Sequence, residues 1–125
     1  MVTFKVVKQQ KLEYLVMDEI LQWFAKNIPI NHEFIRKYKD DEPIEQPLLA
    51  ELQQKYGLNI TRADRFFRAA YWYLMDHRIL KVETRLSWDC DVGYCDYALA
   101  HPLAEGEVQE LIPAILQRYG NGLGI

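Results

Sequence analysis

The stretch that decides the fold is residues 47–101, PLLAELQQKYGLNITRADRFFRAAYWYLMDHRILKVETRLSWDCDVGYCDYALAH. Pro47 and Gly57 frame a segment with one apolar stripe, because proline suits the first turn of a helix and glycine suits its end. A longer amphipathic segment follows, from about Thr61 to His77, with Thr61 and Asp64 placed as a capping signal. Alternating apolar and polar residues then predict a β-hairpin. The order is therefore helix, turn, helix and hairpin.

The flanking segments add three helices and a strand to this core. Apolar residues recur at helical spacing over 11–27, which predicts a first long helix. Residues 31–38 predict a short helix capped by Asn31, and 107–119 predict a last helix that Pro113 kinks or delays. Alternation over 2–6 predicts a short N-terminal strand.

The helix predicted over 61–77 has two distinct faces. At 100° per residue the apolar residues fall on one side and the polar ones on the other. The apolar side consists of Ala63, Phe66, Phe67, Ala70 and Leu74, and the opposite side of Arg62, Arg65, Arg68, Ala69, Trp72 and Asp76. We expect the first set to lie in the core and the second to be available for contacts.

The hairpin is predicted from strands over 80–88 and 94–101. A two-residue turn at Val92 and Gly93 would set four pairs opposite one another, namely Trp88 and Tyr97, Leu86 and Leu99, Cys90 and Cys95, and Asp89 and Asp96. The last pair is two carboxylates that repel each other. Either the turn is longer than two residues, or another group neutralises the tip.

The element order resembles the winged helix-turn-helix superfamily over residues 11–119. The residues that carry the resemblance are the Gly57 turn, the helix end over 74–80, the hairpin, and the segment from Tyr97 to Gly106. Two departures stand out, because many bacterial regulators of that fold have glycine where this chain has His77 and Arg78, and threonine where it has Ala100. The resemblance implies an α+β winged helix-turn-helix with a β-hairpin wing and flanking N- and C-terminal helices. It also implies a DNA-binding homodimer joined through the last helix.

Arg62, Arg65, Arg68 and Trp72 form the candidate DNA-binding site. Arginine donates two hydrogen bonds to a guanine edge or pairs with a phosphate, and a recognition helix presents such side chains to the major groove. The helix over 61–77 would then be the recognition helix of a small transcriptional regulator that binds double-stranded DNA. The competing interpretation is a solvated helix face whose arginines pair with nearby carboxylates.

Trp72 also belongs to the second hypothesis, a non-catalytic protein–protein interaction module that acts as an adaptor or inhibitor. A large exposed aromatic side chain implies a contact with something. Asp89, Asp91 and Asp96 would lie at the wing tip, where they repel DNA phosphates but suit a basic protein partner. Trp72 and these three aspartates form the candidate partner-binding site.

Length, charge and composition exclude several other classes. The 125 residues match one domain, over 1–119 with a flexible tail at 120–125, and the net charge is −3. Residues 47–88 carry seven Lys and Arg against four Asp and Glu, whereas 89–125 carry one against six. No apolar run is long enough for a membrane, so we expect a cytoplasmic protein. No catalytic motif is present, and we expect neither an enzyme nor a cofactor.

Cys90 and Cys95 admit three interpretations. The two thiols together with His101 or His77 form a weak zinc-binding pattern. Cysteines that face each other in a hairpin can also form a redox-sensitive disulfide bridge. The expected state in the cytoplasm is two reduced thiols that pack as small apolar groups, with no metal site.

Overall fold

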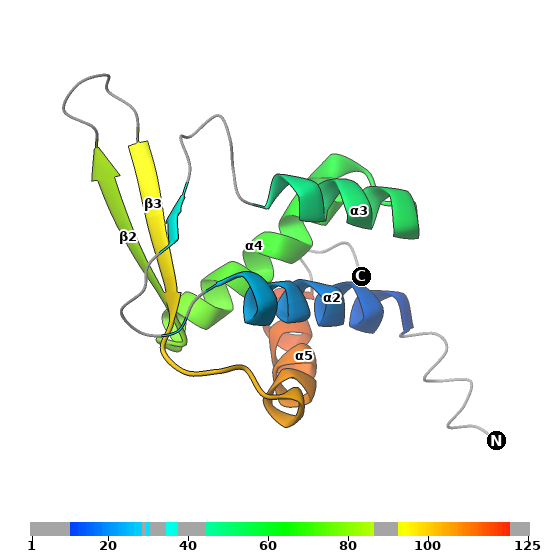
Figure 1. Ribbon diagram of the computed structural model, residues 1–125. Helices are drawn as coiled ribbons and strands as arrows, with labels where there is room; N and C mark the ends of the chain where they lie inside the picture. Colours follow the sequence, from blue (N-terminus) through cyan, green and yellow to red (C-terminus); the bar gives the residue numbers. More distant parts are fainter. Residues whose placement is uncertain (1–10, 29, 31–34, 38–44, 87–92, 121–125) are drawn as a thin grey trace.

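The computed structural model describes residues 11–28, 30, 35–37, 45–86 and 93–120. These residues form an α+β chain of four helices and one three-stranded antiparallel sheet, compatible with a winged-helix layout (Figure 1). In chain order the elements are α2 (Lys11–Asn27), β1 (Ile35–Lys37), α3 (Gln46–Tyr56), α4 (Ile60–Asp76), β2 (Leu80–Leu86), β3 (Gly93–Leu99) and α5 (Glu105–Tyr119).

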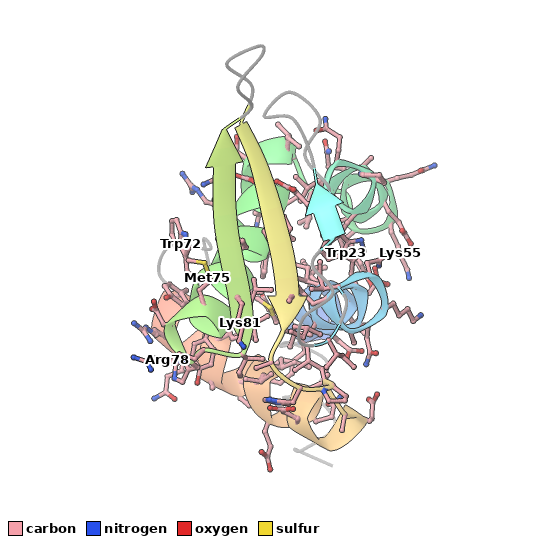
Figure 2. All side chains as sticks on the ribbon, turned by 60° about the vertical axis from the view of Figure 1, so that its left-hand side comes forward. Trp23, Lys55, Trp72, Met75, Arg78 and Lys81 are labelled. Carbon is pink, nitrogen blue, oxygen red and sulfur yellow. The ribbon has the colours of Figure 1, made fainter. Side chains whose placement is uncertain are left out.

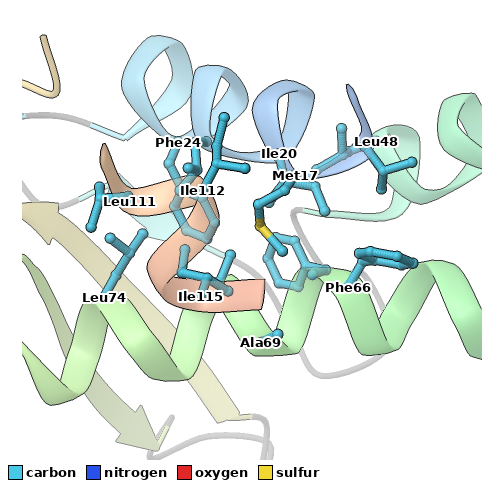
Figure 3. Close-up of a cluster of buried hydrophobic side chains, with 14 of the residues drawn as sticks. Met17, Ile20, Phe24, Leu48, Phe66, Ala69, Leu74, Leu111, Ile112 and Ile115 are labelled. Atoms are coloured by element: carbon cyan, nitrogen blue, oxygen red, sulfur yellow. The ribbon is translucent and has the colours of Figure 1, made fainter. Parts of the chain in front are cut away.

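The core lies where the four helices meet. Figure 3 shows side chains of α2, α4 and α5 in one cluster, with Leu48 of α3 at its edge. Phe66 of α4 is fully buried in this cluster, and the ring of Phe67 stacks on Phe24 of α2 with 5.4 Å between centroids. Because these apolar side chains leave water together, they fix the direction of α4 relative to α2 and α5.

Each long helix follows the predicted apolar periodicity. The bounds of α2 match the prediction, and Gly57 ends α3 in the left-handed conformation with φ 67° while its N–H donates to the carbonyl of Gln53. Helix α5 begins two residues earlier than predicted, and Pro113 lies inside it on the exposed side.

The short helix predicted over 31–38 is wrong where the structure describes that segment. Residues 35–37 form strand β1, which pairs antiparallel with β3 so that Ile35 lies opposite Tyr97. Pairing with a distant strand satisfies the backbone donors and acceptors of this segment, and three residues of local sequence cannot reveal that partner.

The hairpin register also differs from the prediction. Leu80 lies opposite Leu99, Val82 opposite Tyr97 and Leu86 opposite Gly93, which is a shift of six residues. An even shift leaves the alternation of the two strands unchanged, so Leu80 and Leu99 still belong to the same face. Leu80 and Leu99 are 3% and 1% exposed, so core packing at the base of the hairpin favours this register.

The new register replaces all four predicted pairs and moves one aspartate. Thr84 lies opposite Cys95 and Glu83 opposite Asp96, so the pairings of Cys95 with Cys90 and of Asp96 with Asp89 are wrong. Asp96 lies in the middle of β3 and not at the wing tip. The predicted turn at Val92 and Gly93 lies mostly in residues 87–92, which fall outside the described residues.

Several predictions fall on parts of the chain outside the described residues. They are the strand over 2–6, the positions of Cys90, Asp89 and Asp91, and most of the tail. None of the helices in the described ranges has the length and apolar character that a membrane span requires.

Candidate nucleic-acid interface

Helix α4 carries most of the candidate site, and its start is set by a side-chain cap. The side chain of Asn59 accepts a hydrogen bond from the backbone N–H of Arg62 at 2.8 Å, so Asn59 is the N-cap and the predicted capping role of Thr61 is wrong. Asparagine caps well because its oxygen satisfies one of the unpaired N–H groups of the first turn. The helix begins at Ile60, one residue before the predicted start.

One side of α4 is buried as predicted, and this orients the other side outward. Phe66, Ala70 and Leu74 are fully buried against the other elements. Ala69 was expected on the polar side but is 3% exposed, because α5 packs over that flank, with Ile115 close to it in Figure 3. The flank toward the sheet is held by Tyr71, whose ring meets Tyr97 of β3 edge to face.

The outer strip of α4 consists of Arg65, Arg68 and Trp72. Both arginines are exposed, and Trp72 is 46% exposed. These three positions are separated by three and four residues, the spacing that aligns side chains along one helix face. The structure therefore brings three of the four predicted DNA-binding residues onto one accessible line.

The fourth predicted residue, Arg62, sits on the edge of this strip. Its guanidinium lies 5.7 Å from the centre of the Phe66 ring, and the residue is only partly exposed. A cation over an aromatic face is a stabilising contact within the fold. Arg62 is therefore less available than Arg65 or Arg68 for a partner.

Carboxylates modulate the charge of the strip. The Arg68 guanidinium donates a hydrogen bond to Asp64 at 2.7 Å, one turn earlier on the helix. Glu45, at the start of α3, interacts electrostatically with both of these groups. Burial, together with the negative charge of Asp64, raises the pKa of the Glu45 carboxyl above 4.5. Arg65, in contrast, has no ion pair with any residue that the structure describes.

The far end of α4 is tied to α5. Arg118 of α5 donates a hydrogen bond to Asp76 at 3.1 Å and lies over the ring of Tyr73. This contact neutralises the second carboxylate on the outer half of α4. The two carboxylates of α4 are thus both engaged, while Arg65 stays available.

Two further cations, which were not predicted as site residues, follow α4. Figure 2 shows Arg78 and Lys81 on the same side of the molecule as Trp72 and Met75. Both cations are exposed, one in the turn after α4 and one at the start of β2. Over residues 61–81 the chain has five Lys and Arg against two Asp, which is the sequence signal that identifies this longer basic segment.

The opposite side of the molecule has a different character. A groove of about 380 Å³ is lined by Glu19, Gln22, Trp23, Lys26, Asn27, Leu48 and Glu51. The carboxylate of Glu19 binds Lys55 and accepts a hydrogen bond from the Tyr56 hydroxyl. With two glutamates and one lysine in its lining, this groove does not suit a phosphate.

Two of the four predicted partner-binding residues, Trp72 and Asp96, lie in the described part of the chain. Trp72 is exposed, but Asp96 lies within β3, and Asp89 and Asp91 fall outside the described residues. Among the residues that the structure describes, no group of three or more histidine, cysteine, aspartate or glutamate side chains is placed to hold a metal ion.

Comparisons with known proteins add no relative to this picture. No protein-family model, no curated protein and no solved structure matches the chain.

Proposed function

We propose that this chain is a winged-helix protein that binds double-stranded DNA through the outer strip of α4. The observation that carries the proposal is the alignment of Arg65, Arg68 and Trp72 on one exposed line, directly opposite the buried face of the same helix. We further propose that the protein acts as a small regulator of transcription, without catalytic activity.

The arrangement of α3 and α4 supports a helix-turn-helix. The two helices are joined by a short turn at Gly57, and the second one exposes its arginines. In a helix-turn-helix the second helix enters the major groove while the first crosses the DNA backbone. The sheet order β1-β3-β2 with a hairpin after α4 is compatible with a wing.

The dimensions of the outer strip suit a major groove. Arg65 and Trp72 are seven residues apart, or about 10 Å along the helix axis at 1.5 Å per residue. The major groove of B-DNA is about 12 Å wide. By their chemistry, Arg65 and Arg68 suit guanine edges, and Trp72 suits an apolar contact such as a thymine methyl group.

Protein binding is the second candidate function, and Trp72 is the observation that favours it. An exposed tryptophan next to arginine is a frequent centre of protein interfaces, where it supplies large apolar area. Met75, three residues further along α4, is partly exposed and would extend that area. On this hypothesis Arg68 and Asp64 would remain paired on binding.

Fluorescence anisotropy with a mixed-sequence DNA duplex separates the two functions. We expect binding that weakens steeply as salt rises, and a large loss of affinity in the variant Arg65→Ala with Arg68→Ala. The matched control is Lys26→Ala with Lys55→Ala, which removes the same charge on the groove side of the molecule. Absence of binding by the folded protein at low salt, or equal losses in both variants, would overturn the DNA proposal.

The expected homodimer is a separate proposal. Analytical ultracentrifugation checks this proposal directly, since the molar mass measured for a dimer would be twice the 14.8 kDa of the chain. A monomer at the concentrations used for DNA binding would contradict it.

A further inference from the structure

The turn after α4 places a cation in an unusual backbone position. Arg78 has φ 58°, in the left-handed region, where glycine is usual at the end of a helix. Two hydrogen bonds fix this turn, because the N–H of Arg78 donates to the carbonyl of Met75 at 3.0 Å and the N–H of Ile79 donates to that of Leu74 at 2.8 Å. This is a Schellman motif with arginine at the position that glycine commonly holds.

Arginine at that position costs conformational energy that glycine would not. A left-handed conformation is disfavoured for residues with a Cβ atom, because that atom approaches the following carbonyl oxygen. The side chain gains no ion pair in return from any group in the described part of the chain. Contacts within the described residues therefore do not explain a cation there.

Lys81 follows Arg78 by three residues and is equally exposed. It is the second residue of β2, it is exposed, and no carboxylate among the described residues pairs with it. Asp76 is the acidic residue nearest in sequence to this turn, and it is occupied by Arg118. Figure 2 shows Arg78 and Lys81 on the side of the molecule that carries Trp72.

We propose that Arg78 and Lys81 form a phosphate-binding site that anchors the C-terminal end of α4 to the DNA backbone. This inference rests on the proposed function. A guanidinium binds a phosphate through two parallel hydrogen bonds, and the ammonium group of lysine adds a point charge. The ligand is thus one backbone phosphate, or two adjacent ones, and the site carries no base specificity.

The length of α4 places this site at the edge of the groove. Eleven residues separate Arg65 from Asp76, or about 16 Å along the axis, which exceeds the groove width of about 12 Å. In a helix-turn-helix the N-terminal residues of the recognition helix contact the base edges. With Arg65 and Arg68 inside the groove, Arg78 and Lys81 reach the phosphates that border it.

The acidic residues of the hairpin sequence favour a backbone anchor elsewhere in the chain. Glu83 and Asp96 lie opposite each other in β2 and β3, and Asp89 and Asp91 stand in the sequence between these strands. Carboxylates repel phosphates, so the usual backbone contact from a hairpin tip is unfavourable in this chain. The base of the hairpin supplies that contact in its place.

The salt dependence of DNA binding tests the site. The variant Arg78→Asn with Lys81→Gln removes both charges, and asparagine tolerates the left-handed conformation of position 78. Each lost phosphate contact lowers the slope of log K against log salt by about 0.9, so we expect a slope smaller by about 1.8. When salt rises from about 50 to 200 mM, the fold-loss of affinity of the variant is then roughly ten times smaller than that of the wild type.

The controls distinguish this inference from the proposed function. Lys26→Gln with Lys55→Gln should keep the wild-type slope, and the loss at Arg78 and Lys81 should be equal on duplexes of different sequence. The anchor is wrong if the Arg78 and Lys81 variant keeps the wild-type salt slope. DNA binding through α4 still stands in that case if Arg65→Ala with Arg68→Ala loses affinity. If the folded wild-type protein does not bind DNA at low salt, both the anchor and the proposed DNA binding are wrong. Lys81→Glu, which leaves the turn untouched, provides the same test if the double variant does not fold.

Discussion

Asp64→Asn should strengthen DNA binding, although it removes an ion pair from the fold. The exposed pair between Asp64 and Arg68 must break or weaken before Arg68 can bind DNA. Such pairs at positions i and i+4 contribute about 0.3–0.5 kcal/mol. A carboxylate about 8 Å from a phosphate adds about 0.5 kcal/mol of repulsion in water. Together these effects amount to about 1 kcal/mol, or an affinity gain of about fivefold.

Anisotropy titration of Asp64→Asn and Asp18→Asn on one duplex measures this gain. Asp18 belongs to α2, so its substitution changes the net charge equally without touching α4. We expect the gain for Asp64→Asn alone, together with a small loss of thermal stability from the broken pair. Equal affinities for the two variants, or weaker binding by Asp64→Asn, would refute the role assigned to Arg68.

Three further predictions concern stability. Arg78→Gly should leave the melting temperature unchanged or raise it, since relief of about 1 kcal/mol in the left-handed turn offsets the greater entropy of glycine in the unfolded chain, whereas Arg78→Val should lower it. Glu45→Gln should raise the melting temperature near neutral pH but not well below pH 4.5. Its raised pKa means that the folded state binds the proton more tightly, so stability falls as pH rises from 4.5 through the folded pKa. Phe66→Ala should cost about 3–5 kcal/mol in denaturant unfolding, because it empties a fully buried site. A melting temperature clearly lowered by Arg78→Gly, a gain from Glu45→Gln that does not change with pH, or a loss below about 1 kcal/mol for Phe66→Ala would contradict these expectations.

Local patterns in the sequence were enough to predict the four helices that the structure describes. The apolar spacing of α2 and the buried face of α4 depend on residues three and four apart, which the sequence displays directly. Strand β1 was missed because its identity depends on pairing with β3, about sixty residues away. The hairpin register was missed for a similar reason, since Leu80 and Leu99 are fixed by the core.

The candidate site shows the same division. Arg65, Arg68 and Trp72 were predicted to share an exposed face, and the structure places them there. Ala69 was misplaced because its burial comes from α5, which is distant in sequence. Arg78 was not singled out as a site residue because its residue type does not signal a left-handed turn, which glycine would have done.

The most direct test of the central claim is a chemical-shift titration of the ¹⁵N-labelled protein with duplex DNA. Trp72 and Trp23 each carry an indole N–H, and they lie on opposite sides of the molecule, which provides an internal control (Figure 2). We expect the indole signal of Trp72 and the backbone signals around Arg65 and Arg68 to shift while that of Trp23 stays in place. Shifts confined to Trp23 and the groove between α2 and α3, or no shifts at all, would contradict DNA binding through α4.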